Sequence, residues 1–188
     1  MTSNLAIFTR QIRSRSSEHR QAMELLAKAG LVGQMISVLR QELDSMVRVI
    51  YLLAQSTERQ ELLIEASVRG EKWTQEASRA RVTDKEMVDL AQHLQGWTQS
   101  VYKFGCAFIH LSNLHDYNDR DPLQQLPEAE RRDIIAHCRH YHGGPNVGTE
   151  RFKELVPYIP SVFQKIAGNL ELYVVDLEKK STLRPAEI

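Results

Sequence analysis

Residues 31–55 read LVGQMISVLRQELDSMVRVIYLLAQ, and this stretch decides the fold class. Its apolar residues recur at steps of three and four: Leu31, Met35, Val38, Leu39, Leu43, Met46, Val47, Ile50 and Leu53. Steps of this size place the side chains along one face of an α-helix. The pattern therefore predicts one long helix whose continuous apolar face must be covered by other helices.

The same helical period continues on both sides of this stretch. Further helices are expected over residues 4–28, 57–69, 83–114, 127–142 and 160–180. Gly30 and Gly33 separate the first two helices, and Thr83 with Glu86 has the form of a capping box, which opens a helix. Residues 70–82 contain little apolar content and are expected to form a mobile polar connection.

No segment shows the apolar alternation or the clustered β-branched residues that are typical of strands. A chain of 188 residues corresponds to one domain by the usual size range and is long enough to bury a core. The sequence therefore predicts an all-α bundle of five to seven helices that forms a single domain over residues 1–188.

Composition and charge exclude several classes of protein. No apolar run approaches the roughly 18 to 20 residues that a membrane span needs. The N-terminus lacks a basic stretch followed by an apolar one, so no cleaved signal is expected, and we expect a cytoplasmic protein. The 24 basic residues are balanced by 24 acidic ones, which argues against a dedicated DNA-binding module. An enzyme that contacts RNA briefly is compatible with this balance.

Residues 131–142, RRDIIAHCRHYH, carry the densest chemistry of the chain. They place Arg132, Asp133 and His137 in the first turns of an expected helix that starts at Pro127 and stops by Gly143. Five of the seven histidines fall between His110 and His142. Arginine is always charged and histidine titrates near neutrality, so together they can stabilise a phosphate and move a proton.

Metal-independent RNA cleavage needs a base for the ribose 2′-hydroxyl and positive charge on the phosphate. His137 is the candidate acid or base, Arg132 the candidate phosphate ligand, and Asp133 the residue that orients either of them. Five residues along a helix correspond to a rotation of about 140°, so Arg132 and His137 do not share a face. They could converge through a distorted first turn or across a two-fold axis with a second copy.

The segment Arg132-Asp133-Ile134-Ile135-Ala136-His137 resembles the Arg-polar-x-x-x-His signature of the HEPN family of all-helical domains. This resemblance implies a ribonuclease that needs no metal or other cofactor and works as a homodimer with a composite cleft. Many members of the family belong to prokaryotic toxin–antitoxin or antiviral defence systems, so an antitoxin partner is also implied. One branch carries a tyrosine two residues after the histidine, whereas this chain has Arg139 there and its nearest tyrosine is Tyr141.

Other polar residues are candidate contacts to the substrate: His110, Asn113, His115, Tyr141 and His142. The alternative for His110 and Asn113 is a hydrogen-bonded helix end. A metal site is a further alternative, built from His137, Cys138, His140 and His142 with His115 and Asp116. The chain lacks the Cys-x-x-Cys, His-x-x-x-His and His-Glu-x-x-His pairs that recur in zinc sites, so no metal ligands are assigned.

A non-catalytic role is the main alternative for the whole chain. In that interpretation Arg132 is a surface residue paired with Glu128, and His137 is an interior or interface histidine. The protein would then be a helical interaction or subunit protein that works through its apolar faces.

Overall fold

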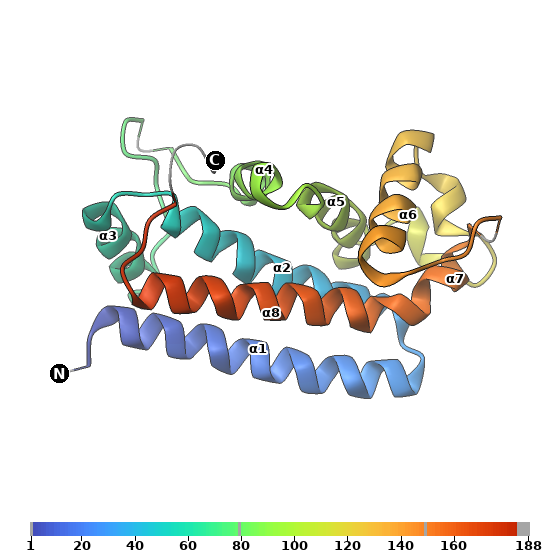
Figure 1. Cartoon of the computed structure of the whole chain (residues 1–188), viewed down its shortest axis with the longest axis horizontal. Coiled ribbons are helices and arrows are strands. Elements are labelled where there is room, and N and C mark those ends of the chain that lie inside the picture. The colour runs from blue at the N-terminus through green and yellow to red at the C-terminus, as the bar shows by residue number, and fades with distance from the viewer. Residues whose placement is uncertain (1, 79, 149, 184–188) are drawn as a thin grey trace. The chain divides into compact units, whose positions relative to one another are not determined.

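The computed structural model describes residues 2–78, 80–148 and 150–183 (Figure 1). Its elements are α1 (Asn4–Ala29), α2 (Val32–Leu53), α3 (Thr57–Val68), α4 (Asp84–Gln95), α5 (Thr98–Ile109), η1 (Asn113–His115), η2 (Pro122–Gln125), α6 (Glu128–His142), α7 (Phe152–Leu155), η3 (Val156–Tyr158) and α8 (Ile159–Glu178). Among these residues the only β pairing is an isolated bridge between Thr74 and Arg81. The all-α prediction is therefore confirmed, and so are the predicted helices around α1, α2, α3 and α8.

The chain divides into two compact units by its internal contacts. Unit 1 comprises Met1–Glu18, Asp44–Thr98 and Ala167–Ile188, and unit 2 comprises His19–Leu43 and Gln99–Ile166. The three longest helices, α1, α2 and α8, each contribute residues to both units. Whether the whole chain behaves as a single domain stays a prediction.

The core of unit 1 includes the second half of the apolar stripe in α2. Met46, Val47 and Ile50 are fully buried there, as the helical spacing predicts. Residues of α3, α4 and α8 complete this core: Leu63, Ile64, Met87, Val88, Ala91, Leu170, Val174 and Leu177. Burial of these side chains removes apolar surface from water, which is the main stabilising contribution to such a bundle.

The core of unit 2 combines the first half of α2 with an aromatic cluster. The rings of Phe108 and Phe152 stack with centroids 6.0 Å apart, and Tyr117 lies 6.0 Å from Phe152. The carboxylate of Asp121 accepts hydrogen bonds from the backbone N–H groups of Leu123 and Phe152, which ties η2 to α7. These contacts hold the region that follows α5 against α7.

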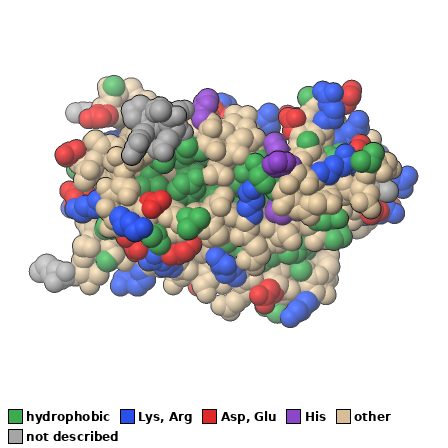
Figure 2. Space-filling model, in the orientation of Figure 1, with side chains coloured by type: hydrophobic (Ala, Val, Ile, Leu, Met, Phe, Trp, Pro, Cys, Tyr) green, Lys and Arg blue, Asp and Glu red, His purple; other side chains and the backbone are tan. Residues whose placement is uncertain are grey.

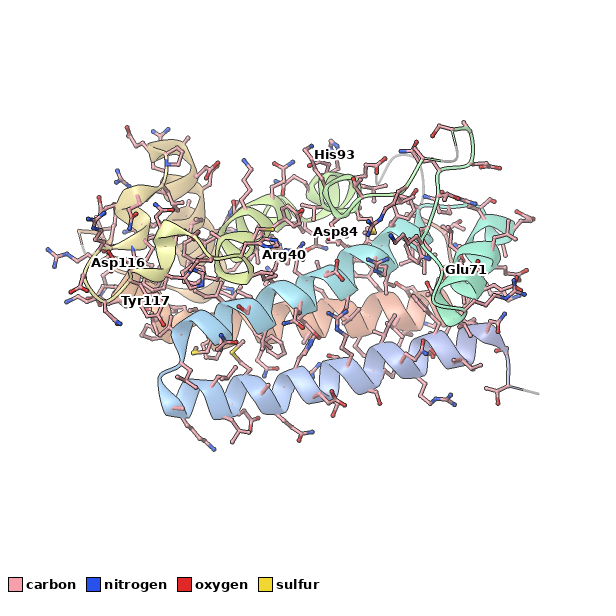
Figure 3. All side chains as sticks on the ribbon, turned by 180° about the vertical axis from the view of Figure 1, so that it is seen from behind. Arg40, Glu71, Asp84, His93, Asp116 and Tyr117 are labelled. Carbon is pink, nitrogen blue, oxygen red and sulfur yellow. The ribbon has the colours of Figure 1, made fainter. Side chains whose placement is uncertain are left out.

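Two polar features are buried within unit 2. His19 of α1 and Glu42 of α2 approach to 2.7 Å through Nδ1 and Oε2, and both side chains are buried. Arg40 of α2, labelled in Figure 3, lies with its guanidinium carbon 4.2 Å from the centroid of the Tyr102 ring. A Cβ atom at Gly105 of α5 would lie 2.7 Å from Cβ of Arg40, so glycine allows this close approach of the two helices.

The prediction of one helix over residues 83–114 is wrong. Two helices, α4 and α5, occupy this range and are separated at Gly96, which has φ +73° and ends α4 through a hydrogen bond to the Gln92 carbonyl. Glycine adopts this left-handed conformation without the steric cost that other residues incur. The predicted capping box of Thr83 and Glu86 at the start of α4 is confirmed.

The connection between α3 and α4 is polar, as predicted, but buried side chains at its two ends anchor it to the core of unit 1, which a mobile connection would not show. Trp73 is buried, and its indole N–H donates to the carbonyl of Leu63 at 2.8 Å. The indole also stacks on Tyr51, with centroids 5.9 Å apart, and Val82 is buried at the other end. The sequence pattern did not indicate this anchoring because a single tryptophan in a polar stretch shows no periodicity.

None of the helices in the described ranges combines the length and the apolar composition that crossing a membrane requires.

Candidate functional site

The candidate site is built on α6, whose ends follow from local sequence. Pro127 occupies the N-cap, one position before the helix rather than its first residue as predicted. Glu128 and Glu130 lie in the first turn, where carboxylates interact favourably with the positive end of the helix. Gly143 ends the helix with φ +77°, and its N–H donates to the carbonyl of Arg139.

The side chain of Arg139 holds the segment that follows α6. Its guanidinium donates to the carbonyls of Pro145 and Asn146 and forms an ion pair with Glu150 at 2.9 Å. The guanidinium of Arg139 is therefore bound by residues of the segment 145–150. The end of α6 is tied to the chain that leads to α7.

Burial separates the residues of α6 in and beside the motif into two groups. Ile135 and Cys138 are buried in the core of unit 2, whereas Arg132 and Asp133 are exposed. Among the described residues, Arg132 makes no hydrogen bond or ion pair, and the alternative pair with Glu128 is not formed. Its guanidinium therefore faces solvent.

His137 is half-buried on α6. Its Nδ1 atom is buried and has no hydrogen-bond partner among the described residues. Burial lowers the pKa of His137 below its ordinary value of 6.5; the negative charge of Asp133 opposes this shift, and His140 and Lys165 reinforce it. The imidazole is therefore mostly neutral at pH 7, which is the form that accepts a proton.

Arg132 and His137 are not brought together within one chain. α6 is a continuous α-helix over Glu128–His142, so the idea of convergence through a distorted first turn is wrong. In such a helix the two residues are about 140° apart in rotation and about 7.5 Å apart along the axis. Asp133, four residues before His137, is the motif residue that shares a face with it.

His110, Asn113 and His115 belong to the segment that follows α5. His110 is exposed, immediately beyond the last residue of the helix. Asn113 donates through Nδ2 to Oε1 of Gln125 at 2.6 Å, and Nδ1 of His115 accepts from the N–H of Ser112 at 3.3 Å. The two contacts fit the alternative of a hydrogen-bonded helix end for this segment.

Tyr141 and His142 lie at the other end of α6, beside a lysine that the sequence did not single out. Lys165 of α8 places its Nζ 3.0 Å from the centroid of the Tyr141 ring. The ring of His140 stands edge-on to Tyr141, with centroids 4.5 Å apart. We call His137, His140, Tyr141, His142 and Lys165 the α6–α8 cluster. Figure 2 shows, in purple, the histidine side chains that reach one face of the molecule.

The α6–α8 cluster combines an ammonium group with two imidazoles, those of His137 and His142, whose pKa values are lowered. Burial lowers the pKa of His142, and the positive charge of Lys165 lowers it further. Burial also lowers the pKa of Lys165 itself. Such a group of side chains can accept a proton at an imidazole and attract an anion at the ammonium.

Cys138 of α6 belongs to the alternative set of metal ligands and is buried. Burial raises the pKa of the Cys138 thiol to about 11, so the thiolate that binds metals or attacks substrates is scarce at neutral pH. Within residues 2–78, 80–148 and 150–183, no three His, Cys, Asp or Glu side chains are grouped so that they could hold a metal ion. His137, His140 and His142 therefore form no such group with His115 and Asp116.

Sequence reasoning missed Lys165 for a physical reason. It lies 24 residues after Tyr141, beyond the Gly143–Pro145 turn and α7, and nothing in its neighbourhood in the sequence marks it. Its place beside α6 depends on how the start of α8 packs within unit 2.

Comparisons of this chain with protein family models, with curated proteins and with solved structures found no match.

Proposed function

We propose that this chain is a metal-independent endoribonuclease or RNA-binding protein of the HEPN type. His137 is its acid or base, and Arg132 binds the phosphate. The observation that carries the proposal is the half-buried imidazole of His137, whose pKa is lowered by burial, on the face of α6 where Tyr141 holds the ammonium of Lys165. A neutral imidazole with a lowered pKa is suited to take a proton from a hydroxyl group at neutral pH.

The reaction proposed is an in-line displacement at phosphorus. Since Nδ1 of His137 is buried, Nε2 is the nitrogen that receives the proton of the ribose 2′-hydroxyl. The 2′-oxygen forms a bond to phosphorus, the bond to the 5′-oxygen breaks, and that oxygen takes a proton from water as it leaves. The protonated imidazole of His137 then returns its proton to solvent. The products are a 2′,3′-cyclic phosphate and a 5′-hydroxyl, and no oxidant, reductant or metal is required.

The proposed active form is a homodimer, because Arg132 and His137 lie on different faces of one helix. A two-fold axis would bring Arg132 of one copy toward His137 of the other, as the composite clefts of the HEPN family imply. Arg132 is exposed and faces solvent, so it is accessible to a second copy. The proposed setting is the cytoplasm of a prokaryote, in a defence or toxin system with an antitoxin partner.

The test is cleavage of a mixed-sequence RNA by purified protein with His137 replaced. His137→Ala is expected to lose at least about 100-fold in rate, because a positioned acid or base contributes about 10² to 10⁴. His93→Ala is the matched control, since His93 is an exposed histidine of α4 outside the candidate site. Full activity of His137→Ala, with helicity by circular dichroism unchanged, would remove His137 from the mechanism.

A second candidate function is that of a non-catalytic helical interaction protein. Ile109 and Leu111 favour it, since they are 45% and 93% exposed on either side of His110. Large apolar side chains exposed side by side are a feature of protein contact surfaces. In this case Leu111→Ser would abolish a complex that Arg132→Ala and His137→Ala leave intact, as measured by size-exclusion chromatography with light scattering.

A further inference from the structure

The position of Lys165 relative to α6 is defined by its contact with Tyr141. Its Nζ lies 3.0 Å from the ring centroid, so the ammonium group rests on the face of the ring. Cations favour this position because the face of an aromatic ring carries negative electrostatic potential. Tyr141 is four residues after His137, and residues four apart in a helix are neighbours on one face. The ammonium therefore lies on the side of α6 that carries His137.

The electrostatics of the neighbouring imidazoles agree with this placement. The charge of Lys165 contributes to lowering the pKa of both His137 and His142. A single ammonium that acts on both histidines lies within electrostatic reach of the two rings. The groups that act on His137 are thus Asp133 and His140 on its own helix and Lys165 on α8.

Other basic residues of α6 do not offer a cation at this place. Arg132 is rotated about 140° away from His137. Arg139 is engaged with two carbonyls and Glu150, and Arg131 donates to Gln124 at 2.8 Å. Lys165 of α8 is the cation that is held against Tyr141, on the face of α6 that carries His137.

We propose that Lys165 binds the scissile phosphate beside His137, so that the proton acceptor and one phosphate-binding cation of the site come from the same chain. This inference rests on the proposed ribonuclease function and adds a residue that the HEPN motif does not contain. Tyr141 is a positioning residue in this arrangement, because its ring holds the ammonium at the face of α6. Arg132 of a second copy would then approach the phosphate from another side.

The binding test uses inorganic phosphate and the histidine side-chain signals in nitrogen-15 NMR spectra. In the wild-type protein, phosphate is expected to raise the pKa of His137, because a nearby anion stabilises the protonated ring. Lys165→Met is expected to weaken phosphate affinity by about 10-fold or more, because a hydrogen bond between charged groups is lost. Lys153→Met is the matched control, since Lys153 is an exposed lysine of α7 in the same unit.

Conservative variants separate a contact to phosphate from a structural role. Lys165→Arg keeps the charge and should retain phosphate binding, whereas Lys165→Gln keeps much of the side chain and should lose it. Tyr141→Phe keeps the ring and should behave as wild type, and Tyr141→Leu should weaken binding. Equal phosphate affinity of the wild type, Lys165→Gln and Lys165→Met would overturn the proposal.

The RNA cleavage assay distinguishes this inference from the function on which it rests. If the wild type leaves RNA uncleaved while phosphate binding still depends on Lys165, the ribonuclease proposal fails and an anion site at Lys165 remains. If His137→Ala abolishes cleavage while Lys165→Met cleaves RNA and binds phosphate normally, only the role of Lys165 fails.

Discussion

His137 and Cys138 show how burial acts on neighbouring residues of one helix. Burial disfavours the charged form of each group, which lowers the pKa of the imidazole and raises that of the thiol. Both side chains are therefore mostly neutral at pH 7. The sequence predicted that His137 is a candidate acid or base, but the direction of its pKa shift depends on the residues packed around it.

The lowered pKa of His137 predicts how stability depends on pH. The unfolded chain takes up a proton near the ordinary pKa of 6.5, whereas the folded chain resists protonation until a lower pH. The free energy of unfolding should therefore be highest above about pH 6.5 and should fall as the pH drops through the folded pKa of His137. His142 contributes in the same direction, because its pKa is also lowered.

Urea unfolding between pH 8 and pH 5 measures this effect. His137→Gln should lose less stability over this range than the wild type, because glutamine does not take up the proton. His93→Gln should follow the wild-type curve, since His93 is exposed. Identical pH profiles of wild type and His137→Gln would show that burial does not shift His137.

At the scale of the element, most helices were predictable because their signals are local. Apolar spacing, the capping box of Thr83 and the glycine after His142 each depend on residues within one or two turns. The break between α4 and α5 was missed although Gly96 marks it, because apolar residues continue at helical spacing on both sides. Thr98, the first residue of α5, is fully buried and donates to the carbonyl of Val88, a contact that only the packed structure shows.

Two glycine substitutions should have opposite effects on stability. Gly96→Ala should destabilise the protein by about 1 to 2 kcal/mol, because Gly96 has φ +73°, where a Cβ atom is strained. Gly168→Ala in α8 should stabilise it by about 0.5 to 1 kcal/mol, since nothing lies within 4 Å of a Cβ placed there. Thermal unfolding followed by circular dichroism compares the two, and equal shifts would contradict the assigned helix end.

At the scale of the whole molecule, the candidate site depends on contacts between helices that are distant in sequence. Lys165 reaches Tyr141 from α8, and the buried pair of His19 and Glu42 joins α1 to α2. The motif itself places Arg132 and His137 on different faces of α6. The proposed site is therefore complete only if a second copy contributes its Arg132.

Mixing two inactive variants tests this requirement. Arg132→Ala and His137→Ala should each be inactive in RNA cleavage. Because Arg132 is exposed, Arg132→Ala should change the free energy of unfolding by less than about 0.5 kcal/mol. After unfolding and refolding together in equal amounts, they should regain about a quarter of wild-type activity, because half of the dimers hold one intact site of two. Absence of recovery, with a dimer present by light scattering, would place both residues of each site in one chain.

The sequence by itself determined the all-α class, the bounds of most helices, the N-terminal capping box of α4 and the C-terminal glycine of α6, because these depend on spacing and side chains within a few residues. It also determined that Arg132 and His137 point in different directions, which follows from 3.6 residues per turn. Only the tertiary structure decided that Lys165 lies against Tyr141, that Trp73 anchors its connection and that the proton on His137 is held weakly. These features come from packing between segments far apart in the chain, where burial and neighbouring charge act on each group.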